Sequence, residues 1–211
     1  MRAQWFLGAV SICWMGFVSI ANAEVKLPKI FSNSMVLQRD RAVPVWGWDN
    51  PGTEVTVSIG EASAKAKADA AGKWTVQLPA MKAGGPYIVK VEGSSKVEFS
   101  DVLFGEVWLC SGQSNMVMTL QKGPWCGYGG VLNVDAEVAS AVDSQIRVYQ
   151  AGKGWRVCSP QTAPEFSATA FFFARTLRER LKTPVGLLIA AGGGGKPETK
   201  AGNAYYCFAL P

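Results

Sequence analysis

The sequence predicts a small antiparallel β-sandwich followed by an α/β segment with a parallel sheet. Between residues 25 and 104, short stretches of alternating apolar character are separated by turn-forming residues. After residue 104, apolar strands alternate with stretches whose apolar residues recur at helical spacing, which is typical of a parallel sheet covered by helices. This change of period divides the chain into a β-sandwich domain over residues 24–104 and an α/β domain over residues 105–211.

The first 23 residues are predicted to be an export signal. Arg2 precedes an apolar run from Trp5 to Ile20, and Ala21-Asn22-Ala23 supplies the small residues that a signal peptidase reads. A membrane anchor is the alternative, but the run is short for a bilayer span and no basic stop-transfer segment follows it. We therefore expect a mature chain that begins at Glu24, is periplasmic or extracellular, and has no membrane association after cleavage.

The predicted sandwich contains four clear strand patterns bounded by turns. Within Glu54 to Ile59, Val55, Val57 and Ile59 alternate with polar residues, as a strand with one solvated face requires. The other three patterns behave similarly, and several short strands at this spacing favour a sandwich. The four expected strands are Val43 to Trp48, Glu54 to Ile59, Lys73 to Gln77 and Tyr87 to Val91.

The predicted α/β segment contains three strands and two helices. Asn133 and Asp135 suit the positive end of the first helix, Ser167 suits the N-cap of the second, and Lys182-Thr183-Pro184 ends the second helix. The stretch from Gly192 to Pro211 has no clear periodicity and is predicted to be irregular. Three strands are few for such a sheet, so the domain is expected to be incomplete. The strands are Val107 to Cys110, Gln145 to Tyr149 and Val185 to Ala190, and the first helix spans Asn133 to Val142.

Charge and cysteine content narrow the choice of partners. The formal net charge is +5, or +4 without Arg2, and the basic residues form no stripe, so a nucleic-acid partner is not expected. No Cys-x-x-Cys spacing suggests zinc, and no metal site is predicted. An exported compartment permits disulfides, but the sequence does not decide the pairing among Cys110, Cys126, Cys158 and Cys207.

Ser114 is the candidate nucleophile. It follows an apolar strand in a Gly112-Gln113-Ser114-Asn115 turn, and open α/β sheets place their chemistry at the carboxyl ends of strands. Backbone N–H groups at the start of the next helix could hold a developing oxyanion. Helix capping is the alternative role for this serine. The chain contains no histidine, so the usual general base is absent, and Lys122 is the nearest candidate for an alternative base.

A longer string around this serine resembles the nucleophile block of the sialate O-acetylesterase family, carbohydrate esterases related to the SGNH hydrolases. The string is Gly105-Glu106-Val107-Trp108-Leu109-Cys110-Ser111-Gly112-Gln113-Ser114-Asn115-Met116. The resemblance covers roughly Leu27 to Ala191 and includes, in order, Ser34 to Arg39, Val43 to Trp48, Ala71 to Trp74, Gly154-Trp155, Cys158 to Pro160 and Thr183 to Leu187.

The resemblance implies an SGNH-like, flavodoxin-like parallel sheet and hydrolysis of acetyl esters on a sugar or glycan, with no cofactor. Ser114 is then the nucleophile, and its N–H and that of Gly193 are the oxyanion donors. Gly193, Gly194 and Glu198 match the family, whereas Gly192 and Lys200 stand where it has tryptophan, so a flexible glycine-rich loop is the alternative there. The family's histidine and its acidic partner lie further along a longer domain. We therefore expect a truncated chain of weak or no activity.

A non-catalytic secreted module that binds carbohydrate or protein is the second hypothesis. Trp46, Trp48 and Trp74 could offer faces on which sugars stack, although packing in a core is the commoner use of tryptophan. The missing histidine favours this hypothesis, whereas the intact nucleophile block favours an esterase.

Overall fold

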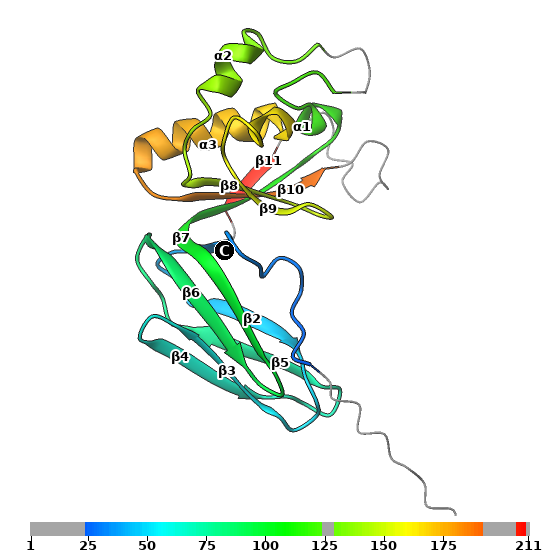
Figure 1. The fold of residues 1–211 in the computed structure, drawn as a ribbon, viewed down its shortest axis with the longest axis vertical. Coiled ribbons are helices and arrows are strands. Elements are labelled where there is room, and N and C mark those ends of the chain that lie inside the picture. The colour runs from blue at the N-terminus through cyan, green and yellow to red at the C-terminus, as the bar shows by residue number, and fades with distance from the viewer. Residues whose placement is uncertain (1–23, 124–128, 192–205, 210–211) are drawn as a thin grey trace, which may run out of the picture.

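The computed structural model describes residues 24–123, 129–191 and 206–209, so the predicted export signal lies outside the described residues. A strand-rich part occupies one end of the molecule and the helices gather at the other (Figure 1). All four strands expected in the first part are present, together with β1 and β4, which were not predicted. The bounds are β1 Val36–Gln38, β2 Val43–Trp48, β3 Glu54–Ile59, β4 Ala62–Lys67, β5 Lys73–Leu78 and β6 Gly84–Glu92.

Two sets of strands enclose one apolar core in this part of the chain. β2 pairs antiparallel with β5, and β3 pairs antiparallel with both β4 and β6. The predicted alternation in β3 is confirmed, because Val55, Val57 and Ile59 are buried and the residues between them are not. Buried residues of both sets belong to the same cluster, among them Val43, Val45, Trp74, Val76 and Leu78 from one set and Val55, Val57, Ile59, Val89 and Val91 from the other.

A single long strand, β7 (Lys96–Gly112), crosses the predicted domain boundary. Its first part pairs antiparallel with β6, and its second part pairs parallel with β10 (Val185–Ala191). Figure 1 shows β7 rising from the strand-rich part into the part that carries the helices. The described strands other than β2 and β5 therefore form one mixed sheet that is continuous through β7, and a separate β-sandwich domain stays a prediction.

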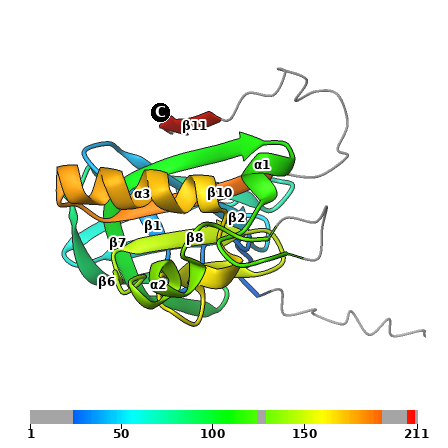
Figure 2. The same cartoon turned by 90° about the horizontal axis from the view of Figure 1, so that it is seen from above.

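The second part of the chain contains the expected parallel strands. β10 lies between β7 and β8 (Ile146–Gln150) and runs parallel to both. β9 (Gly154–Val157) pairs antiparallel with β8, and Figure 2 shows the helix α3 lying along β10, between β7 and β8. The helices are α1 Ser114–Val117, α2 Val134–Ala139, the 3₁₀ helix η1 Ala163–Glu165 and α3 Ala168–Leu181.

Ser167 caps α3 as predicted, and Asn133 and Asp135 lie at the predicted end of α2, at its N-cap and in its first turn. The Ser167 hydroxyl accepts a hydrogen bond from the Ala170 N–H at 3.3 Å, as an N-cap residue does. Asn133 precedes α2 with φ of 55°, in the left-handed region, and its side chain makes no cap hydrogen bond. α2 is also shorter than expected and has no buried residue, so little apolar packing supports a longer helix.

The prediction that the last twenty residues are irregular is also wrong in part. Tyr206–Ala209 forms a strand, β11, which pairs antiparallel with β7 over Trp108 to Ser111. The second half of β7 therefore has a neighbour on each side, β10 and β11. Four residues are too few for a strand pattern to stand out in the sequence, and the pairing depends on an edge supplied by a distant segment.

Successive side chains of β10 point to opposite faces of the sheet, and the two faces pack against different parts of the molecule. Leu187 belongs to the apolar cluster beneath α3, whereas Leu188 packs with Val36 of β1 on the other face. Gly186 shares this second face, where a Cβ atom would lie 2.7 Å from the Cβ of Val36. The absence of a side chain at Gly186 thus lets the strand-rich part approach the parallel strands closely.

A buried arginine joins β8 to the first half of β7. The Arg147 side chain is 4% exposed, and its Nη2 lies 2.8 Å from Asp101 Oδ1. Its Nη1 also donates to the carbonyl oxygen of Asp101, and the Ser34 hydroxyl donates to the other carboxylate oxygen at 2.9 Å. Removing the charge of Asp101 would leave a buried guanidinium with weaker partners, which is costly.

We expect Asp101→Asn to lower the free energy of unfolding by about 1–2 kcal/mol, less than for a fully buried pair because Asp101 is 43% exposed. Asparagine also tolerates the positive φ of this position, 57°, so the variant tests charge and not backbone strain. Urea unfolding measures the effect. Glu54→Gln is the control, because the exposed Glu54–Lys65 pair should leave the midpoint nearly unchanged, and equal losses would contradict the prediction.

Candidate active site

The carboxyl ends of three parallel strands meet beside Ser114. In the register of the sheet, Ile189 of β10 lies between Cys110 of β7 and Gln150 of β8. β7 ends at Gly112, and Ser114 begins the short helix α1 two residues later. The sequence prediction that this serine follows a buried strand and opens a helix is therefore confirmed.

The backbone around Ser114 excludes the capping role. Gln113 occupies the N-cap position of α1, and Ser114 is the first helical residue. Gly112 has φ of 155°, at the edge of the range that glycine adopts more readily than other residues. As the first residue of the helix, Ser114 has no partner for its N–H within α1. Its side chain is exposed, and no hydrogen bond of its hydroxyl to another described residue is present.

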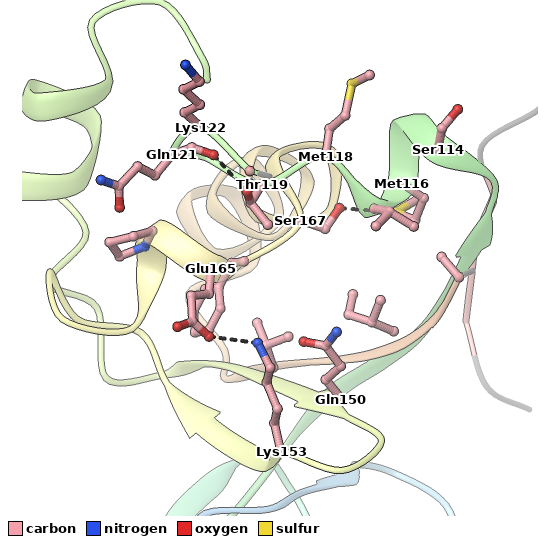
Figure 3. Close-up of a pocket in the computed structure, with 17 residues that line it drawn as sticks. Ser114, Met116, Met118, Thr119, Gln121, Lys122, Gln150, Lys153, Glu165 and Ser167 are labelled. Carbon is pink, nitrogen blue, oxygen red and sulfur yellow. Dashed lines mark hydrogen bonds and ion pairs between the residues drawn. The ribbon is translucent and has the colours of Figure 1, made fainter. Parts of the chain in front are cut away.

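Ser114 lies at the rim of a cavity of about 510 Å³. Figure 3 shows its hydroxyl directed away from the centre of this cavity. Met116, Val148, Phe166 and Ile189 make much of the wall apolar. The polar lining residues are Thr119, Gln121, Lys122, Gln150, Lys153, Glu165 and Ser167.

One wall of the cavity carries a chain of charged and polar groups. Glu165 Oε2 lies 2.8 Å from both Lys153 Nζ and Arg156 Nη1. The hydrogen bond from Lys153, helped by the charges of both cations, holds the pKa of Glu165 below its usual value. Arg156 also lies over the ring of Phe166 and donates from Nη2 to Gln150 Oε1 at 3.2 Å.

The described residues bring no general base to Ser114. No titratable side chain there is hydrogen-bonded to its hydroxyl, and the whole sequence lacks histidine. Lys122, the alternative base, lines the same cavity, but Figure 3 shows its amine on the side remote from Ser114. Gly193, the second expected oxyanion donor, lies outside the described residues, as do Glu198 and Lys200.

The three tryptophans that could stack on sugars differ in exposure. Trp74 is 1% exposed and belongs to the core. Trp46 is half-buried, with its ring edge-on to Phe31 at 4.8 Å between centroids. Trp48 is 45% exposed. Of the three, Trp48 alone therefore presents a substantial face to solvent.

The cysteines show one buried thiol with an altered pKa. Cys158 donates to the Ala141 carbonyl oxygen at 3.6 Å, and burial raises the pKa of its thiol to about 11. Cys110 is also buried, and the β7–β11 register places Cys207 opposite it. Cys126 lies outside the described residues, and no group of three side chains suited to a metal ion occurs among those described.

The polar wall of the cavity was not predicted from the sequence. Gln150 directly follows the predicted strand Gln145 to Tyr149 and ends the observed strand β8. Its position could have been noticed in the sequence, because side chains at the carboxyl ends of parallel strands face the crevice. Lys153 and Glu165 gave no such signal. Lys153 precedes β9 and Glu165 ends η1, and only the fold brings them together.

Comparison with known proteins first defines the class. No family model matches the chain. Its fold is similar to the crystal structure of a carbohydrate acetylesterase from Xanthomonas citri, with a TM-score of 0.75 and 37% identity. The match covers 83% of this chain and 42% of that one. The fold is therefore similar to that of a carbohydrate acetylesterase.

Within this class, the chain is homologous to sialate O-acetylesterases, which confirms the resemblance expected from the sequence. It is 31% identical to those of Homo sapiens and Pongo abelii over 191 residues and 30% identical to that of Mus musculus over 198 residues. Each alignment covers 77% of this chain, which spans about a third of the length of these curated relatives, 35–36%.

Proposed function

We propose that this chain carries the nucleophile and part of the substrate cavity of a carbohydrate O-acetylesterase. The observation that carries the proposal is the position of Ser114, at the carboxyl end of β7 and at the rim of the cavity. The homology to acetylesterases over most of the chain supports it. The substrate would be an O-acetylated sugar or glycan.

The proposed reaction has two steps. The oxygen of Ser114 attacks the acetyl carbonyl carbon, the bond from that carbon to the sugar oxygen breaks, and the sugar leaves as an alcohol that takes a proton. Water then attacks the acetyl-enzyme, which releases acetate and restores the serine. The N–H groups of Ser114 and Gly193 would stabilise the negative charge on the carbonyl oxygen in both steps. No residue of this chain is assigned the role of the base.

We also propose that the protein is exported and that its mature chain begins at Glu24. Residues 24–104 would then form a β-sandwich, and the esterase segment would follow it. The composition of residues 1–23 and the change of sequence period support this organisation. No helix in the described part of the chain is long and apolar enough to cross a membrane.

Labelling with an alkyl fluorophosphonate tests the proposal. Over hours at mildly alkaline pH, Ser114 should be modified faster than Ser140, an exposed serine at the end of α2 that serves as the internal control. The reason is that the turn presents the Ser114 hydroxyl beside free N–H donors. Peptide mass spectrometry gives both rates. Equal slow labelling of the two serines would instead favour the non-catalytic binding module, to which the missing histidine and the exposed Trp48 point.

A further inference from the structure

Gln150 lies in the same cavity as Ser114, on a different strand of the sheet. It ends β8, the second strand away from β7 in the sheet, and shares its register with Ile189 and Cys110. Both Gln150 and Ser114 line the cavity. Figure 3 shows the amide of Gln150 directed into the cavity from the side opposite Lys122 and Thr119.

The orientation of the Gln150 amide follows from its partner. Arg156 Nη2 donates a hydrogen bond to Oε1 of Gln150 at 3.2 Å. A guanidinium group has hydrogen-bond donors but no acceptor. The oxygen of the amide must therefore face Arg156, which leaves the NH₂ group toward the cavity. No hydrogen bond of this NH₂ group to another described residue is present.

Arg156, the partner of Gln150, has contacts of its own behind the cavity wall. Arg156 is held by Glu165 at 2.8 Å and by the ring of Phe166, whose centroid lies 5.0 Å from the guanidinium carbon. Glu165 is held in turn by Lys153 at 2.8 Å. A hydrogen-bond donor that a neighbouring group already orients loses less freedom when a ligand binds, so it can discriminate between ligands.

We propose that Gln150 is a specificity-determining residue that donates a hydrogen bond to an oxygen of the sugar, the alcohol portion of the ester. This inference rests on the proposed function and names how that site recognises its substrate. A cavity of about 510 Å³ is of the size that holds small-molecule ligands. Its apolar walls, including Val117 and Ile189, suit the CH face of a sugar ring, and Gln150 supplies a directed polar contact.

The test compares binding of two acetyl esters to the 211-residue chain. The probes are methyl 6-O-acetyl-α-D-glucopyranoside, which carries a sugar, and phenyl acetate, which does not. Gln150→Glu is nearly isosteric and can still face Arg156, but it lacks the NH₂ donor. The loss of one neutral hydrogen bond should weaken binding of the sugar ester about three- to tenfold and leave binding of phenyl acetate unchanged. NMR titration measures both affinities.

Two further variants complete the test. Gln150→Met removes the donor without adding a charge and should weaken sugar-ester binding to a similar extent. Gln161→Ala removes an exposed glutamine outside the cavity and should bind both esters as the parent chain does. A parent chain that does not bind the sugar ester, or Gln150 variants with unchanged affinity for it, would overturn the inference. Labelling of Ser114 in the same samples separates this outcome from a failure of the proposed function.

Discussion

The 211-residue chain should hydrolyse an aryl acetate at a rate close to that of the uncatalysed reaction, despite carrying the proposed nucleophile. A serine hydroxyl is a poor nucleophile near neutral pH unless a base takes its proton. The chain has no histidine, and no described side chain is hydrogen-bonded to the Ser114 hydroxyl. Loss of triad members typically lowers kcat by about 10⁴- to 10⁶-fold.

The control for this experiment is Ser114→Ala. Because the parent chain is expected to be nearly inactive, both proteins should give the same rate of phenyl acetate hydrolysis, followed as phenol release. Rapid turnover in the parent chain that disappears in the variant would show that another residue of this chain acts as the base. Lys122, which lines the same cavity, would then be the first residue to replace.

Gly105→Ala should produce the largest loss of stability among single substitutions at the junction of the two halves. A Cβ atom at this position would overlap the carbonyl oxygen of Pro184 and lie within 2.7 Å of the Pro184 carbonyl carbon and Cβ. The neighbouring Glu106 N–H donates to that same carbonyl at 2.8 Å, so relief of the overlap would break the start of the β7–β10 pairing. We expect a loss of about 3 kcal/mol or more in the free energy of unfolding.

Urea unfolding of Gly105→Ala beside Gly129→Ala checks this expectation. Gly129 is exposed, and a Cβ atom there would meet no atom within 4 Å, so the control should unfold near the parent midpoint. If both variants unfolded at the parent midpoint, the close approach of Pro184 to β7 would not be present in solution.

Strands and helices with long, regular patterns were predictable from the sequence. β2 and β3 have the predicted bounds, and Ser167 caps α3 as expected, because alternation and capping are local properties of the chain. Four strands, β1, β4, β9 and β11, were missed. β1 and β11 pair with different parts of β7, from which they are distant in sequence, and a local pattern does not report such pairing.

The candidate active site shows most clearly which features the local sequence predicts and which depend on the tertiary structure. The sequence by itself determined that Ser114 follows a buried strand and opens a helix, and that no histidine is available to it. Only the tertiary structure decided that Gln150 shares a cavity with this serine and that Lys153, Glu165 and Arg156 hold the wall behind it. The physical reason is that strand order and register set which side chains meet at a sheet edge, and both depend on contacts between distant segments.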